Sequence, residues 1–261
     1  MAFTVHAVMP GVWHIVDCMG VCMTLLEGEN AAMLVDTGYG IEDVADFMRH
    51  MTDLPLTVFL THNHHDHAMG ARCFPETYML EADMADWCMF TNDEMRRRVL
   101  TQAIGKNLPV DEKTFLAGEI PLPKVMKPGV IDLGGLTAEI IEAPGHTPGS
   151  AVVYVPERKL LLSGSDWNPC TWLFFPQALG LREYRSNMRG IQQLPFEKVL
   201  CPHREALYDR WMFDDFFNAL TDGNLRAAEP VNIAPYEQID TCQATLPHDQ
   251  VLVFDWAKSG L

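Results

Sequence analysis

The order of apolar and polar residues in the first part of the chain predicts strands, then a helix, then another strand. Residues 12–36 hold two or three apolar strands, with a polar turn at 27–30. An apolar face at helical spacing predicts an amphipathic helix over about 40–51. The β-rich apolar run 56–60 follows Pro55 and predicts a buried strand. These elements suit a sheet with a helix packed on it.

The second half of the chain repeats this order. The predicted strands are residues 130–133, 136–143, 151–155, 160–162 and 198–200. Helical spacing of apolar residues marks a helix around 184–194 and another around 212–220. Strands in two runs, each followed by helices, predict an α/β protein with two packed sheets and helices outside them.

Two segments fall outside this repeated order. Residues from about 81 to 128 are predicted to be a helical insertion, in which Thr91 and Glu94 form a capping box. From about residue 229 the chain is rich in proline and is expected to be an irregular extension, apart from a final strand at 251–254. No stretch resembles a linker, so we expect residues 1–261 to form a single domain.

Composition narrows the choice of partners. The chain is 48% hydrophobic and carries a formal net charge of -16. An acidic excess of this size repels polyphosphate and argues against nucleic-acid and anionic-membrane partners. The N-terminus lacks a signal-peptide pattern, no apolar run is long enough to span a membrane, and the seven cysteines are scattered. We therefore expect a cytoplasmic protein with reduced thiols.

A cluster of histidines follows the predicted buried strand 56–60. Residues 61–67 read Thr-His-Asn-His-His-Asp-His, so several imidazoles and a carboxylate lie within one short polar run. Burial of apolar surface does not explain such a run, whereas metal binding does, because His nitrogen and Asp oxygen are common ligands of zinc and related ions. A solvated His-rich loop is the alternative. The position directly after a strand favours the metal site.

The cluster resembles the His-x-His-x-Asp-His motif of the metallo-β-lactamase superfamily. Further stretches resemble that superfamily in the same order along the chain: residues 34–38, 143–150, 162–166 and 201–203. The resemblance runs from about Val12 to about Leu220. It implies an αββα sandwich of two mixed β-sheets with helices on the outer faces.

The resemblance also implies a binuclear metal centre. One ion would be held by His62, His64 and His146, and the second by Asp66, His67 and His203, with Asp166 bridging both. Two divalent ions are expected, with zinc first and iron or manganese as alternatives. Asp36 is implied to be a buried carboxylate that orients a ligand, although from the residues alone it reads equally as a turn or capping residue. His65 is expected to point away from the metals.

Residue types at two motif positions suggest a branch of the superfamily. Asp at 166 is similar to the glyoxalase II and lactonase branch, and His64 separates the chain from the flavin-linked oxygen reductases, which carry Glu there. The implied activity is hydrolysis of an ester, thioester or lactone of a small molecule by a metal-bridging hydroxide, with Asp66 accepting the proton. Glyoxalase II itself fits poorly, because the C-terminal basic residues that bind glutathione are not recognisable.

Two other function classes stay open. One is a nuclease or phosphodiesterase of the same superfamily, against which the acidic charge and the lack of a basic arm count. The other is a non-catalytic metal-binding module, against which the full ligand set counts. The expected partner is a small-molecule substrate, and a homodimer is an alternative to a monomer.

Aromatic residues supply the candidate walls of a substrate cleft. The candidates are Trp87, Met89 and Phe90 from the insertion, and Trp167, Trp172, Phe174 and Phe175 after Asp166. About half of them are expected to pack in the core instead. Arg204 is a candidate for an anionic substrate group or for a surface salt bridge, and Arg96–Arg98 reads as a solvated helix face. We expect an ester or lactone with an apolar acyl part to react better than a short, highly anionic one.

Overall fold

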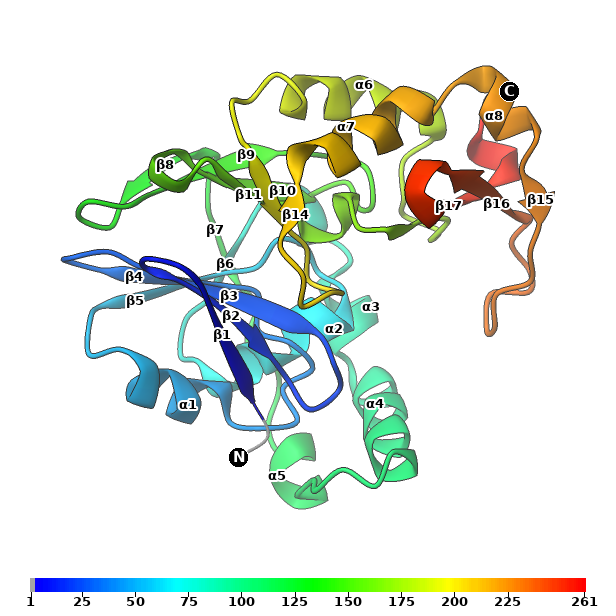
Figure 1. The fold of residues 1–261 in the computed structure, drawn as a ribbon. Coiled ribbons are helices and arrows are strands. Elements are labelled where there is room, and N and C mark those ends of the chain that lie inside the picture. The colour runs from blue at the N-terminus through cyan, green and yellow to red at the C-terminus, as the bar shows by residue number, and fades with distance from the viewer. Residues whose placement is uncertain (1–2) are drawn as a thin grey trace.

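The structure, a computed structural model, describes residues 3–261 and contains two large mixed β-sheets (Figure 1). The first sheet has seven strands in the order β1-β2-β3-β4-β5-β6-β7. Their bounds are β1 Thr4–Met9, β2 Val12–Val16, β3 Cys22–Glu27, β4 Ala32–Val35, β5 Leu56–Phe59, β6 Tyr78–Met79 and β7 Lys124–Val125. Strands β1 to β4 pair antiparallel, and β4 to β7 pair parallel.

The second sheet has six strands in the order β14-β13-β11-β10-β9-β8. Their bounds are β8 Gly129–Asp132, β9 Thr137–Glu142, β10 Ala151–Val155, β11 Leu160–Leu162, β13 Lys198–Leu200 and β14 Tyr208–Asp209. The pair β11 and β13 is parallel, and its other neighbouring strands are antiparallel. The predicted strands of both halves are therefore present, and β1 adds one that periodicity did not indicate.

The two sheets bury their facing sides against each other. Met33, Val35 and Phe59 of the first sheet join Val153 and Leu162 of the second in one buried cluster. Strand β10 is buried along its whole length, which is why it reads as an unbroken apolar run rather than an alternating one. This shared interior is the middle of the predicted αββα sandwich.

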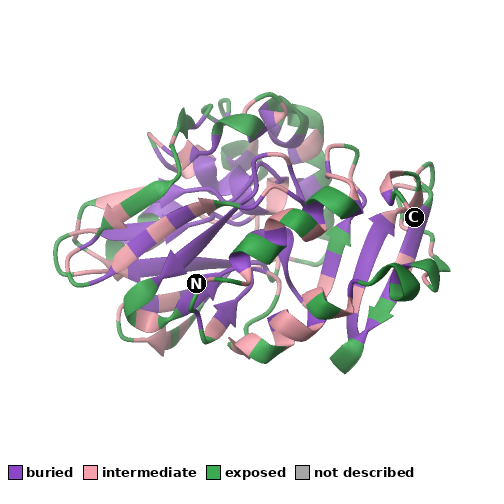
Figure 2. Ribbon diagram, turned by 90° about the horizontal axis from the view of Figure 1, so that it is seen from above, coloured by how far each residue is buried: buried purple, intermediate pink, exposed green. Residues whose placement is uncertain are grey.

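Helices lie on the outer faces of both sheets (Figure 1), and the strands between them are largely buried (Figure 2). Helix α1 (Val44–Met51) begins at Asp43, whose carboxylate accepts from the backbone N–H of Asp46, and buries Val44 and Met48 against the first sheet. Helices α6 (Leu181–Ile191) and α7 (Arg210–Ala219) pack on the second sheet, and α8 (Asp222–Arg226) follows them. The fold class is thus the predicted α/β sandwich.

The insertion is helical as predicted. It contains α3 (Trp87–Thr91), α4 (Asp93–Gly105) and α5 (Glu112–Leu116), whose apolar sides share a separate cluster with residues beside the histidine loop. The predicted cap of α4 was displaced by one residue: Asn92, not Thr91, accepts from the N–H of Met95, while the Thr91 hydroxyl donates to the Trp87 carbonyl. Helix α3 contacts both α4 and the histidine-bearing α2 (His65–Ala68), so it joins the insertion to the histidine cluster (Figure 1).

The prediction of an irregular C-terminal extension was wrong for much of its length. Strands β15 (Glu229–Pro230), β16 (Thr241–Leu246) and β17 (Gln250–Asp255) form a third sheet with β12 (Cys170–Leu173). The β17 strand pairs parallel with β12. The expected final strand, 251–254, lies within β17. The extension is therefore packed beside the segment that follows Asp166.

No helix within residues 3–261 has the length and apolarity to cross a membrane.

Candidate metal centre

Strand ends from both sheets bring the candidate ligands together. His62 and His64 follow β5, His146 lies in the loop between β9 and β10, and His203 follows β13. Neighbouring parallel strands β4 and β5 in one sheet, and β11 and β13 in the other, end at this same edge. Ligand sites collect where such carboxyl ends meet.

The first group of ligands is formed by His62, His64 and His146, all buried, whose donor atoms lie within 4.8 Å of one another. Nε2 of His146 is 2.8 Å from Nδ1 of His64. Nε2 of His62 is buried without a hydrogen-bond partner. Three imidazole nitrogens therefore converge on one point, and we call this group the histidine triad.

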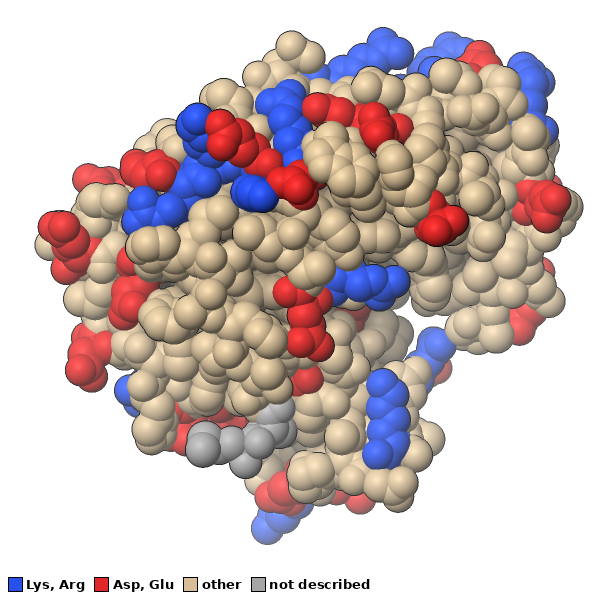
Figure 3. All heavy atoms as spheres, viewed as in Figure 1, with Lys and Arg blue, Asp and Glu red and all other residues tan. Residues whose placement is uncertain are grey.

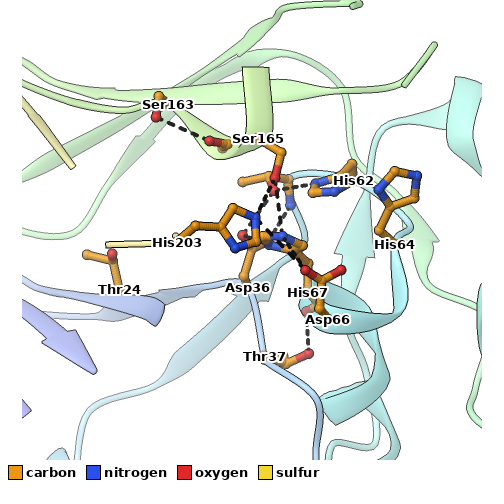
Figure 4. A network of polar contacts seen from close by, with 12 residues as sticks. Thr24, Asp36, Thr37, His62, His64, Asp66, His67, Ser163, Ser165 and His203 are labelled. Atoms are coloured by element: carbon orange, nitrogen blue, oxygen red, sulfur yellow. Dashed lines mark hydrogen bonds and ion pairs between the residues drawn. The ribbon is translucent and has the colours of Figure 1, made fainter. Parts of the chain in front are cut away.

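The second group is formed by Asp66, His67 and His203, with donor atoms also within 4.8 Å of one another (Figure 4). Oδ2 of Asp66 is 3.5 Å from Nε2 of His67 and 3.9 Å from Nε2 of His203. We call this group the aspartate triad. The structure thus brings together six of the seven ligands predicted from the sequence.

Hydrogen bonds on the far sides of the rings set their orientation. Nδ1 of His146 lies 2.6 Å from the Trp172 carbonyl, and must donate to it, which leaves Nε2 as an acceptor. Nδ1 of His67 lies 2.9 Å from Oδ2 of Asp36. Such partners orient metal-binding imidazoles and fix which nitrogen faces the ion. Asp36 therefore has the placement that the resemblance implied.

Most of these side chains are already in the protonation state that binds a metal ion. Burial lowers the pKa of His146 and of His203 to about 4. Burial also lowers the pKa values of His62 and His64 well below the ordinary imidazole value. Neutral imidazole is the form that binds metal, so these rings lose no proton to do so at neutral pH.

The aspartate triad favours a positive charge at its centre. Burial opposes protonation of His67, but the carboxylates of Asp66 and Asp36 raise its pKa to about 10. A divalent ion would supply the positive charge that this environment stabilises. Five imidazoles and one carboxylate are a donor set that suits zinc and is also compatible with iron. The residues present therefore fit a metal ion in each triad.

Asp166, predicted to bridge the metals, is not part of either triad. Its Oδ1 accepts from the backbone N–H of His146 at 2.9 Å, and its other oxygen is buried without a partner. Burial raises the pKa of Asp166 well above its usual range. The residue before it takes the central position instead: Oγ of Ser165 lies 3.2 Å from Nε2 of His67 and 3.3 Å from Nε2 of His203 (Figure 4).

The turn that follows β11 explains this one-residue correction. Residues Gly164–Asp166 form a 3₁₀ turn, in which successive side chains point about 120° apart. Only one of Ser165 and Asp166 can therefore face the triads. Gly164 enters this turn with a φ of +53°, and a Cβ there would lie 3.0 Å from the Ala151 carbonyl oxygen. The backbone, not the residue type, decides which side chain reaches the centre.

Because Asp166 lies outside both triads, we expect the Asp166→Asn variant to bind as many metal ions as the wild-type protein. The amide retains an oxygen that can accept from the His146 N–H, and the carboxylate it replaces does not face the triads. Elemental analysis should give the same number of ions per chain for the variant as for the wild-type protein. Loss of one or both ions from Asp166→Asn, while an exposed control such as Asp53→Asn keeps them, would restore Asp166 as a ligand.

Two buried polar residues that periodicity did not single out hold the ligand loops in place. Asp83, at the start of the insertion, accepts from the N–H of Gly149 and the hydroxyl of Thr147, and also contacts the N–H of Asn63. It therefore ties the His146 loop to the histidine cluster. His14 of β2 lies 3.1 Å from the carbonyl oxygen of Arg204 through Nε2, which anchors the loop of His203.

A pocket of about 470 Å³ opens onto both triads. Of the predicted cleft residues, Phe90, Trp172, Phe175 and Arg204 line it. Phe174 stacks on Phe175 from a buried position, and Met89 is exposed. The other lining residues include Tyr39, His65, Arg98, Gln102 and Tyr236.

Two predicted cleft residues proved to be core residues. Trp87 is buried among the apolar residues of the insertion. Trp167 is fully buried against Tyr208 and Phe213 of the second half. His65 lies outside both triads, as predicted, with its ring at the edge of Tyr39.

Comparisons with known proteins agree with this geometry. The model of the metallo-beta-lactamase superfamily matches residues 16–165. An acyl-coenzyme A thioesterase, MBLAC2, from Gallus gallus is 26% identical over 200 residues, which cover 69% of this chain and 70% of the relative.

Solved structures share the fold at low identity. A metallo-beta-lactamase from Pontibacter korlensis has a TM-score of 0.59 and 17% identity, covering 83% of this chain and 97% of its own. The metallo-beta-lactamase FIM-1 from Pseudomonas aeruginosa, in its mono-zinc form, has a TM-score of 0.58 and 16% identity, covering 82% and 92%. With the family model covering more than half of the sequence, this chain belongs to the metallo-beta-lactamase superfamily and is a metal-dependent hydrolase.

Proposed function

We propose that the protein hydrolyses an ester or thioester of a small molecule, using two divalent ions held by the histidine triad and the aspartate triad. The observation that carries this proposal is the convergence of both triads at one pocket. The similarity to an acyl-coenzyme A thioesterase supports a thioester as the first substrate class to test. Zinc is the first candidate metal.

The ions would supply an activated water at neutral pH and would polarise the substrate carbonyl. The protein's own residues position the substrate and move the protons of the reaction. Burial disfavours the charged form of Asp66, but His67 outweighs this effect and keeps the pKa of that carboxyl well below its usual range. Asp66 also lines the pocket, so its carboxylate can accept a proton from the attacking water and return it to the leaving group.

Ser165 makes the space between the triads less negative than a bridging Asp would. Its hydroxyl is neutral, so Asp66 is the only carboxylate among the six converging ligands. A centre with one fewer negative charge stabilises a developing oxyanion more strongly. The same effect acts on any substrate whose oxygens gain negative charge, so it supports hydrolysis without separating a carbonyl from a phosphoryl substrate.

The aromatic walls predict a preference for apolar acyl groups. Phe90 and Phe175 lie against the His64 ring, with ring centroids 4.5 and 4.6 Å away, and Trp172 is part of the same wall. Burying one such side chain against a substrate stabilises the complex by roughly 1.5–3 kcal/mol. We expect kcat/KM to rise with acyl chain length, and Trp172→Ala to weaken that dependence. An efficiency independent of chain length would contradict the assignment of these walls.

The proposed reaction is tested by a substrate panel. The metal-loaded protein should be assayed with thioesters, simple esters, lactones, phosphodiesters and β-lactams under the same conditions. We expect the highest kcat/KM for a thioester or an ester. Turnover of phosphodiesters alone would instead support the nuclease branch, and turnover of none of these compounds by protein that retains its metal would support a non-catalytic module.

A further inference from the structure

Two arginines stand at the mouth of the pocket, on opposite elements. Arg98 belongs to α4 of the insertion, and Arg204 lies in the loop just after the ligand His203. Both side chains are exposed, and both line the pocket that opens onto the triads. Figure 3 shows basic atoms on both sides of a hollow between α4 and the loop before β14.

Arg98 faces the pocket and not the bulk solvent alone. Burial raises the pKa of Tyr236, and the nearby Arg98 guanidinium opposes that rise. Tyr39 and His65 line the same pocket as Arg98 and Tyr236. Arg98 therefore shares the mouth of the pocket with residues from several different elements.

The neighbouring Arg96 shows what a structural arginine looks like in the same run. Arg96 is almost fully buried, and its guanidinium donates to the carbonyls of Phe115, Ala117 and Gly118. These bonds close the insertion around α4. The expectation that all of Arg96–Arg98 is a solvated helix face was therefore wrong for Arg96. Arg98, by contrast, is exposed.

The charge of the pocket differs from the charge of the whole chain. The formal net charge is -16, yet among residues 3–261 the only charged residues that line the pocket are Asp66, Arg98 and Arg204, and Asp66 is a predicted metal ligand. Among residues 3–261, neither arginine forms a salt bridge with a carboxylate within 4.0 Å (the ion pairs found are elsewhere). Arg204 donates one hydrogen bond from its guanidinium to the His203 carbonyl oxygen, at 3.0 Å. Most of its donors are therefore free for a ligand.

We propose that Arg98 and Arg204 form an anion-binding subsite, which holds a carboxylate or phosphate carried by the substrate at a distance from the scissile carbonyl. Planar guanidinium groups bind such oxyanions through paired hydrogen bonds. The apolar walls of Phe90, Trp172 and Phe175 lie in the same pocket. The substrate class is thus an amphiphilic ester or thioester, with an apolar part and a remote anionic group. This inference rests on the proposed hydrolysis.

Matched thioesters test the subsite and locate the anion. On the leaving-group side, octanoyl-pantetheine is compared with octanoyl-4′-phosphopantetheine. On the acyl side, the octanoyl thioester of 2-mercaptoethanol is compared with the mono-thioester of suberic acid and the same thiol, which adds a terminal carboxylate. The variants are Arg98→Ala, Arg204→Ala and both together. Arg97→Ala is the control, because Arg97 is exposed on the same helix but does not line the pocket.

We expect each single variant to lower kcat/KM by about 10-fold for one anionic thioester, mainly through KM, because a charged hydrogen bond contributes roughly this factor. The neutral partner of that pair should change by less than about 2-fold, and Arg97→Ala should leave both unchanged. Loss confined to the phosphopantetheine pair places the anion on the leaving group, and loss confined to the suberyl pair places it on the acyl group. Added salt should reduce the preference for the anionic member.

Two results overturn the inference, and they are distinguishable from failure of the proposed function. Equal losses for the charged and neutral members would show that the arginines only maintain the shape of the pocket. Equal wild-type efficiency within both pairs would show that no anion is recognised, while hydrolysis itself stands. If the metal-loaded wild-type protein hydrolysed none of these thioesters, the proposed function would fail, and the subsite would fall with it.

Discussion

Replacing one ligand of either triad should lower kcat/KM by about 10³-fold or more. His146→Ala removes a buried donor from the histidine triad, and His203→Ala removes one from the aspartate triad. Metal ions contribute several kcal/mol to such reactions, and each 1.36 kcal/mol corresponds to a factor of ten in rate. Both triads face the same pocket, so we expect a loss of this order from either variant. Steady-state kinetics on the preferred substrate of the panel measure it.

The control for these variants is His50→Ala, which changes an exposed histidine on α1 far from the motif. Its kcat/KM should match that of the wild-type protein. His65→Ala should retain metal, because His65 belongs to neither triad although it lies within the same run. If His146→Ala or His203→Ala kept nearly full activity with a folded structure, the triads would not be the reaction centre.

Asp36→Ala should give the second large effect, a loss of metal affinity of about 10- to 100-fold. Oδ2 of Asp36 lies 2.9 Å from Nδ1 of His67, and the carboxylate also accepts from the backbone N–H and the hydroxyl of Thr61 at 2.7 and 3.0 Å. Alanine leaves these buried donors unpaired, at a cost of about 1–3 kcal/mol for each unsatisfied group. Chelator competition measures the affinity, and denaturant unfolding of the metal-free protein measures the stability.

Asp36→Asn separates the two roles of this residue. Asp36 has a φ of +65°, a left-handed conformation that Asn tolerates better than Ala. Asn also keeps one acceptor oxygen, so it should preserve more stability than Ala while still weakening the His67 contact. Equal stability and equal metal affinity for wild type, Asp36→Asn and Asp36→Ala would contradict the role assigned to the carboxylate.

The fold and most of the ligands could be predicted from the sequence because their signals are local. The histidine run carries its ligands at fixed short spacings after a β-rich strand, so His62, His64, Asp66 and His67 share one short segment that ends in α2. His146 and His203 come from distant segments, and their prediction needed the resemblance to a family. The structure then brings both to the same edge of the sandwich.

The position of Asp166 was mispredicted because adjacent residues compete within a tight turn. Ser165 and Asp166 are neighbours, and the sequence does not show which one the 3₁₀ turn points toward the triads. The resemblance to the superfamily implied the acid as the bridging ligand. The structure shows its carboxylate bonded to the His146 backbone instead.

The cleft was harder to predict than the metal centre, because aromatic residues serve cores and pockets equally well. Trp167 packs against Tyr208 and Phe213, from segments far along the chain, and no local pattern reveals that contact. Tyr236 reaches the pocket only because the C-terminal segment forms a third sheet beside β12. The proline content of that segment concealed its strands.

The central claim is that the two triads each hold a divalent ion, and metal stoichiometry tests it most directly. Protein purified without chelator and supplemented with zinc should contain two ions per chain by elemental analysis, in keeping with the two ligand groups. His146→Ala and His203→Ala should each lower that number toward one. A wild-type value near zero after supplementation, or a value of two that neither variant changes, would contradict the account.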